Sequence, residues 1–129
     1  MAGFSSRAML AQGQQLDVLA PGQWTVAPGS HGPNAGYFFW AGTSFSAPLT
    51  AGVAALMLEK NPTLSQSQAE SILKTTARPM NANDSRAGVL SGFDGMVGTI
   101  SWDTNCNGAP CDPVGAGLLQ ADAALAAAP

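Results

Sequence analysis

Charged side chains are scarce in this sequence, and one long part of it has none. Only 10% of the 129 residues are Asp, Glu, Lys or Arg, against roughly 25% in a typical soluble domain. Between Asp17 and Glu59 no such residue occurs. Because a segment of that length and apolarity is poorly suited to face water throughout, we expect most of it to be buried or to lie at an interface.

Basic residues and long apolar runs are lacking as well. Five Lys and Arg stand against eight Asp and Glu, a net charge of -3, so there is no basic patch to contact phosphates and a nucleic-acid partner is excluded. The most apolar run, residues 49–58, is too short to cross a bilayer, since a membrane-spanning helix needs about 20 residues. We therefore expect one globular unit, residues 1–129, without a membrane partner.

Cysteine is almost absent, and the two that occur are Cys106 and Cys111. Their C-x4-C spacing has no further partners for a zinc site and differs from the C-x-x-C redox motif. A disulfide that closes a small loop in an exported protein fits the pair better. Residues 1–10 contain no apolar core of a signal peptide. We expect a secreted or periplasmic protein whose export signal lies outside this chain.

Turn residues and apolar alternation predict two short strands in the first third of the chain, at residues 14–22 and 37–40. The glycines and prolines of residues 22–36 predict an irregular surface loop between them. A helix is expected from near Ser44 to Lys60, with Pro48 tolerated in its first turn. Asn61 and Pro62 would end it.

The remainder of the chain contains one strong local signal. Ser65 and Gln68 form an S-x-x-Q capping box that opens a second, amphipathic helix through about Thr76. Residues 78–117 are expected to be mostly loop, with one short strand around residues 96–100. Residues 118–128 predict a last, weak helix.

The segment GTSFSAPLTAG, residues 42–52, places a serine at the start of an apolar helix. A serine nucleophile needs an accessible hydroxyl and a base, and the N–H groups and dipole of a helix N-terminus favour the oxyanion formed in acyl transfer. Ser44 can therefore be a nucleophile, or it can simply be the N-cap of the helix. The nucleophile elbow of α/β-hydrolases, G-x-S-x-G, is not matched, because Ser46 stands where the second glycine belongs.

GTSFSAPLTAG resembles the serine motif of the subtilisin-like serine proteases (subtilases, peptidase S8), with Ser44 as the nucleophile. The similarity extends to residues 4–7 and 16–22 ahead of the motif, and to residues 61–77 and 115–125 after it. It implies an α/β fold, a parallel sheet flanked by helices, of which this chain is the C-terminal portion. The implied activity is cleavage of protein or peptide substrates by a serine endopeptidase through an acyl-enzyme.

The resemblance also shows what the chain does not contain. Subtilases use an Asp-His-Ser triad in that order, yet neither the D-[ST]-G motif nor the H-G-T motif occurs here. His31, the only histidine, lies in SHGPNAG, which is not the histidine motif. By the same resemblance, Asp17 occupies a strand position that the family often fills with Asp without a catalytic role. The histidine and aspartate are therefore expected from the remainder of the catalytic domain, and the isolated chain is expected to be nearly inactive.

Further site residues follow from the resemblance. The backbone N–H of Ser44, supported by Thr43 and Gly42, is expected to bind the oxyanion. Trp40, Ala41 and Phe45 are expected to border the substrate cleft. No cofactor and no metal are expected, apart from a structural calcium that the full-length protein can contain. The rival interpretation is a non-catalytic pseudoprotease remnant or binding module of the same fold.

Overall fold

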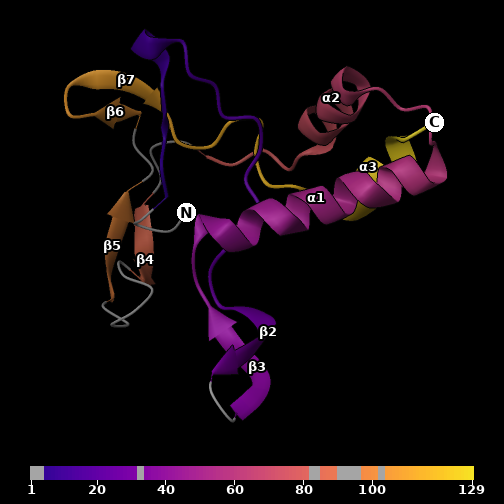
Figure 1. Ribbon diagram of the computed structural model, residues 1–129. Helices are drawn as coiled ribbons and strands as arrows, with labels where there is room; N and C mark the ends of the chain where they lie inside the picture. The colour runs from indigo at the N-terminus through magenta and orange to yellow at the C-terminus, as the bar shows by residue number, and fades with distance from the viewer. Residues whose placement is uncertain (1–4, 32–33, 82–84, 90–96, 102–103) are drawn as a thin grey trace.

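The described part of the chain contains helices and small antiparallel sheets, which is compatible with the expected α/β class, although the expected parallel sheet is not among them (Figure 1). The computed structural model describes residues 5–31, 34–81, 85–89, 97–101 and 104–129. The helices in these ranges are α1 (Thr43–Lys60), α2 (Gln66–Thr76) and α3 (Ala121–Ala127), together with a single 3-10 turn at Leu10–Gln12.

The strands form one three-stranded sheet and two hairpins within the described residues. The three-stranded sheet has the order β1-β7-β6, with β1 at Ala8–Met9, β6 at Asn105–Cys106 and β7 at Ala109–Asp112. One hairpin pairs β2 (Thr25–His31) with β3 (Asn34–Trp40), and the other pairs β4 (Ser85–Val89) with β5 (Val97–Ser101). All of these strand pairs are antiparallel.

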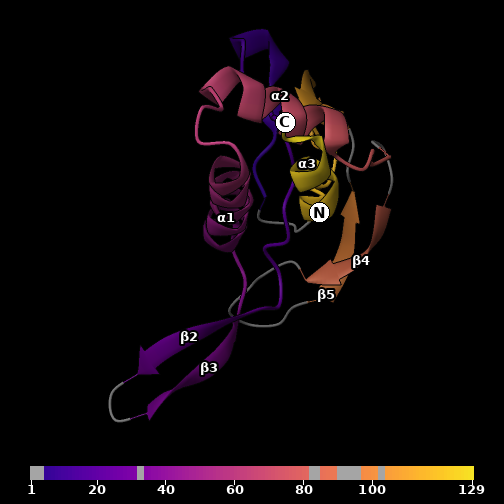
Figure 2. The same ribbon diagram turned by 90° about the vertical axis from the view of Figure 1, so that its right-hand side faces the viewer.

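The buried core lies where the C-terminal half of α1 meets α2 and α3 (Figure 2). It is formed by small and medium apolar side chains: Val53, Met57, Leu64, Ala124 and Ala128. Lys60 links α1 to α3, because its Nζ donates to the carbonyl oxygens of Leu125 in α3 and of Ala128 at the C-cap of α3. The N-terminal half of α1 lies outside this core.

The first two predicted helices are confirmed, with one change at the start of α1. Helix α1 begins at Thr43 and contains Pro48 in its second turn rather than its first. A proline has no N–H to donate to the carbonyl four residues earlier, so the carbonyl of Ser44 loses its usual helical partner. Helix α2 begins with the complete capping box, in which Ser65 N donates to Gln68 Oε1 at 2.9 Å and Gln68 N donates to Ser65 Oγ at 3.3 Å.

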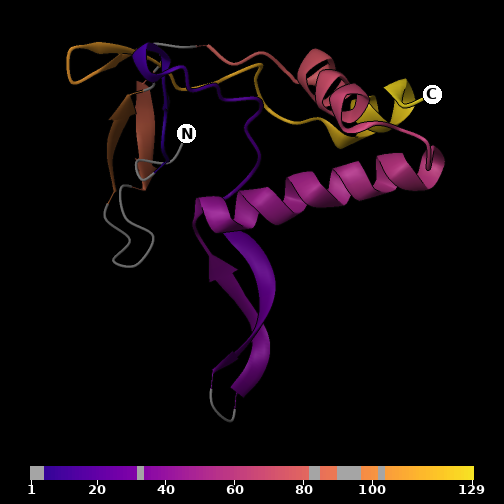
Figure 3. The ribbon, with the colours of Figure 1, turned by 45° about the horizontal axis from the view of Figure 1, so that its top comes forward.

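The loop predicted at residues 22–36 is wrong, because most of it is strand β2 and the start of β3. The two strands pair in register from Thr25 opposite Trp40 to His31 opposite Asn34. The hairpin projects from the N-terminal end of α1, away from the core (Figure 3). The glycines and prolines that suggested a loop are accommodated because a two-stranded hairpin leaves one backbone edge of each strand unpaired.

The strand predicted at residues 14–22 does not form. A single parallel bridge joins Leu19 to Leu118, with Leu19 N donating to Gly117 O at 2.7 Å and Leu119 N donating to Leu19 O at 2.8 Å. A parallel sheet needs neighbouring strands along the whole segment, and in the described part of the chain the bridge between Leu19 and Leu118 is the one ladder contact that residues 14–22 form.

The last third contains more strand than predicted. The strand expected around residues 96–100 is confirmed as β5, but β4, β6 and β7 lie in segments predicted to be loop. The last helix is shorter than residues 118–128, because Leu118 bridges both Leu19 and Arg78 and is therefore extended. Cys106 and Cys111 form the predicted disulfide across the β6–β7 turn, with sulfurs 2.08 Å apart.

Candidate active site

Ser44 lies in the first turn of α1 and is exposed to solvent. The N-cap of the helix is Gly42, which has no side chain to cap with. The alternative that Ser44 is the N-cap is therefore wrong. Among the residues that the structure describes, no hydrogen-bond partner is seen for the Ser44 hydroxyl, so the hydroxyl is not used by the helix.

The positive end of α1 carries no compensating charge. No acidic residue stands in its first turn, and the backbone N–H groups of the first residues of any α-helix lack intrahelical acceptors. Phe45 N donates to Gly42 O at 3.1 Å, which leaves the N–H groups of Thr43 and Ser44 at the open end. Such a helix end favours a negative charge, the property that an oxyanion requires.

An aromatic stack covers one side of this turn. The rings of Trp40 and Phe45 are stacked with centroids 5.7 Å apart at an interplanar angle of 21°. The indole Nε1 of Trp40 donates to Ala27 O at 3.4 Å, which holds the ring against the hairpin. The structure thus brings Trp40 to Phe45, next to Ser44, while Ala41 connects β3 to the turn.

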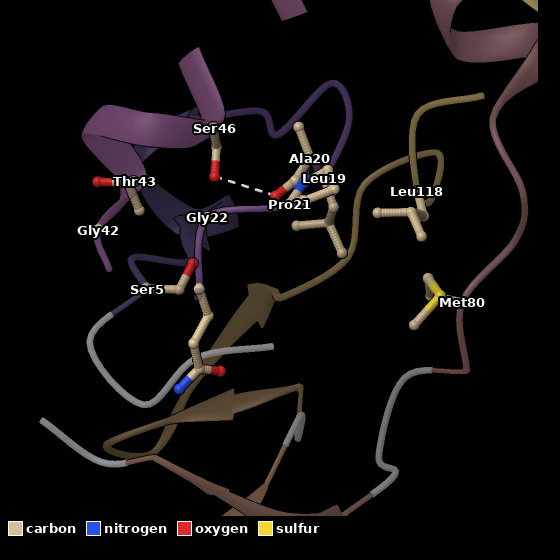
Figure 4. A pocket seen from close by; sticks show the side chains of 11 residues that line it. Ser5, Leu19, Ala20, Pro21, Gly22, Gly42, Thr43, Ser46, Met80 and Leu118 are labelled. Atoms are coloured by element: carbon tan, nitrogen blue, oxygen red, sulfur yellow. Dashed lines mark hydrogen bonds between the residues drawn. The ribbon is translucent and has the colours of Figure 1, made fainter. Parts of the chain in front are cut away.

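The segment Ala20–Gly22 also lies against this turn, next to a pocket of about 230 Å³ (Figure 4). Ser46 Oγ donates to Ala20 O at 3.0 Å, and Gly42 N donates to Gly22 O at 2.7 Å. Apolar side chains, including Leu19 and Leu118, line the far wall. Sequence reasoning missed these two hydrogen bonds. The only signal for them is a small polar residue in the first helical turn, and such a residue commonly bonds to its own helix instead.

Asp17 is engaged in an ion pair well apart from the serine motif in the sequence. Lys74 Nζ lies 2.7 Å from Asp17 Oδ1 and 2.8 Å from Glu70 Oε1. The hydrogen bond with Asp17, and then the one with Glu70, raises the pKa of Lys74 above its ordinary value, partly opposed by desolvation. The Asp17 carboxylate is therefore paired with a side chain of α2. The side chain of His31 lies outside the described part of the structure.

Comparison with known proteins places these residues in a family. The model of the "Subtilase family" matches residues 1–98. Alkaline elastase YaB of Bacillus sp. (strain YaB) is 45% identical over 74 residues, which are 57% of this chain and 19% of the relative. Subtilisin DY of Bacillus licheniformis is 46% identical over 65 residues, 50% of this chain and 23% of the relative.

A third relative, serine protease AprX of Bacillus subtilis (strain 168), is 35% identical over 88 residues, 57% of this chain and 20% of its own length. The chain thus spans about a fifth of each of these relatives. No solved structure matches it significantly. Across the described ranges, no helix has the length and apolarity that a membrane span requires.

Proposed function

Because this chain belongs to the subtilase family, we propose that it supplies the nucleophile of a serine endopeptidase, and that Ser44 is that nucleophile. One observation carries the proposal: the Ser44 hydroxyl is exposed at a positive helix end and does not cap the helix. A hydroxyl in that position can reach the carbonyl carbon of a bound substrate, and it makes no capping hydrogen bond that it would have to break.

The reaction follows from this placement. Ser44 Oγ attacks the carbonyl carbon of a peptide bond and passes its proton to a histidine base. The carbonyl oxygen becomes an oxyanion, which the backbone N–H of Ser44 stabilises together with the helix dipole. The same histidine then protonates the leaving amine, which gives an acyl-enzyme that water hydrolyses. Thr43 and Gly42 form the turn that presents this N–H group.

The histidine and the aspartate of the triad come, in this proposal, from a part of the catalytic domain outside the chain. The exposed apolar surface supports such a partner. Trp24, Tyr37 and Phe39 are 61%, 78% and 69% exposed, and only Val53 and Met57 are buried along the 18 residues of α1. A helix whose apolar residues lie on all sides is normally buried, so the missing part of the domain, with its parallel sheet, would cover this surface.

The substrate and the location follow from the same proposal. A peptide bound at Ser44 would pass the Trp40–Phe45 stack and Ala41, which form the adjacent wall. The disulfide between Cys106 and Cys111 fits an oxidising compartment, so the enzyme is proposed to act after export on proteins or peptides.

The test uses the protein expressed with the coding sequence that lies upstream of residue 1. Ser44→Ala should lower the rate of peptide hydrolysis by several orders of magnitude, because the covalent pathway loses its nucleophile. The 129-residue chain alone should react with a fluorophosphonate no faster than its own Ser44→Ala variant. Unchanged hydrolysis in the longer Ser44→Ala protein would overturn the proposal. An upstream sequence without D-[ST]-G and H-G-T, and a protein without hydrolysis, would favour the non-catalytic remnant.

A further inference from the structure

We propose that Ser46 is a positioning residue: its hydrogen bond to the segment Ala20–Gly22 fixes the first turn of α1 and thereby the Ser44 hydroxyl. The inference rests on the proposed role of Ser44 as nucleophile. It assigns a function to a side chain that the reaction itself does not use.

The first turn of α1 has few anchors within the helix. Its N-cap, Gly42, has no side chain to accept from the N–H groups of the turn, although capping side chains commonly stabilise a helix start by about 1 kcal/mol. Pro48 removes the N–H that would bond to the Ser44 carbonyl. A turn that lacks both contacts depends on neighbouring segments for its geometry.

Two hydrogen bonds from the turn to the segment Ala20–Gly22 provide that support, and Figure 4 draws the one from Ser46. Ser46 Oγ donates to Ala20 O at 3.0 Å, and the bond is partly buried. Gly42 N donates to Gly22 O at 2.7 Å. Gly42 lies two residues before Ser44 and Ser46 lies two residues after it. The two bonds therefore fix the backbone on both sides of the proposed nucleophile.

The two segments approach each other closely at Gly22. A Cβ atom added to Gly22 would lie 2.2 Å from Ser46 Oγ and 2.7 Å from Gly42 O. Real Cβ atoms do not come so near to other heavy atoms, so the glycine is required by the contact with Ser46 and Gly42. Because a misplaced reacting atom costs rate more than it costs binding, loss of the Ser46 bond should affect turnover.

The test compares Ser46→Ala with two other variants in the protein expressed with its upstream sequence. Ser46→Ala should lower kcat about three- to tenfold, the effect of one net hydrogen bond, and leave KM unchanged. The amide of Gly42 should exchange with solvent faster by a similar factor. Ser46→Thr, which keeps a hydroxyl, should restore both values.

Thr50→Val is the matched control, because the Thr50 hydroxyl donates to Ser46 O within the helix at 3.2 Å, a hydrogen bond that does not involve residues 20–22. It should leave kcat and the Gly42 exchange rate unchanged. If kcat falls in both Ser46→Ala and Thr50→Val, in each case in proportion to the decrease in melting temperature, then Ser46 contributes only to general stability and the inference is overturned. So would an unchanged kcat and an unchanged Gly42 exchange rate in Ser46→Ala.

The two proposals fail in different ways. If Ser44→Ala hydrolyses peptides at the full rate, the proposal that Ser44 is the nucleophile is overturned, whatever the result for Ser46→Ala. If Ser44→Ala is inactive and Ser46→Ala is fully active with a protected Gly42 amide, only the positioning role is lost.

Discussion

Gly22 and Ser46 are separated by 24 positions in the sequence, yet they lie so close together, near the candidate nucleophile, that no side chain fits at position 22. At Gly22 any side chain would meet Ser46 Oγ and the Gly42 carbonyl. Ser44 itself makes no such contact and stays exposed. The residues that hold the site are therefore different from the residue that would react.

We predict that Gly22→Ala destabilises the protein by about 1–3 kcal/mol, the usual cost of an added methyl group in a tight site. Thermal or urea unfolding of the two proteins measures the difference. The double variant Gly22→Ala, Ser46→Ala should recover part of the loss, because only the 2.7 Å contact with Gly42 O then remains. Strictly additive losses would show that Gly22 and Ser46 do not interact.

At the scale of elements, helix α2 is held by a local signal at its start and by a distant partner at its end. The capping box of Ser65 and Gln68 fixes the first turn. Lys74, near the last turn, bonds to Glu70 on the same helix and to Asp17, which lies in a segment far away in the sequence. The Lys74 side chain is 34% exposed, so solvent weakens the pair and its contribution is small.

The ion pair predicts a dependence of stability on alkaline pH. The pKa of Lys74 is raised above its ordinary value of 10.5 in the folded protein. Its contribution is therefore fully present below the unfolded pKa and is lost as the pH rises through the folded pKa. Melting temperatures measured from about pH 9 to about pH 12 should fall, and Lys74→Gln should show a smaller fall.

Two further variants assign the effect to a partner. Asp17→Asn should reduce the alkaline fall more than Glu70→Gln, because the hydrogen bond with Asp17 is the largest cause of the raised pKa. An alkaline fall that is the same in Lys74→Gln as in the original protein would contradict this assignment.

At the scale of the whole molecule, many large apolar side chains are exposed, whereas the buried core is small. The buried cluster is confined to one corner, between α1, α2 and α3. The hairpin of β2 and β3 projects away from it (Figure 3). Trp24, just before β2, and Val26, Tyr37 and Phe39 within the hairpin are exposed. The long charge-free segment was expected to be buried or at an interface, and in this chain much of it faces solvent.

Gly52→Ala tests whether this surface is covered in a longer protein. Gly52 lies inside α1 with no atom within 4 Å of an added Cβ. In the 129-residue chain the substitution should stabilise the fold by about 1 kcal/mol, the difference in helix propensity between Gly and Ala. In the protein expressed with its upstream sequence it should destabilise instead, because a packed partner leaves no room for the methyl group.

Urea unfolding of both proteins and of both Gly52→Ala variants measures the two differences. Equal stabilisation in the two contexts would mean that no partner packs against α1 at Gly52, and the proposed remainder of the domain would then have to bind elsewhere.

Local features could be read from the sequence because contiguous residues encode them. The capping box at Ser65 and Gln68 needs only two side chains three positions apart, and helix α1 ends where Asn61 and Pro62 predict. The Cys106–Cys111 disulfide closes a short loop, so few conformations of the loop compete with it. The serine motif, residues 42–52, likewise indicates its family without reference to the rest of the chain.

The tertiary structure alone decided the features that depend on distant partners. Residues 14–22 have the composition of a strand, but they form only a single bridge, because the described part of the chain places no full strand beside them. Residues 25–31 look like a loop, but they become a strand because residues 34–40 pair with them. The hydrogen bond from Ser46 to Ala20 has the same origin. Side chains within one turn meet in any fold, whereas those far apart in sequence meet only after the chain has packed.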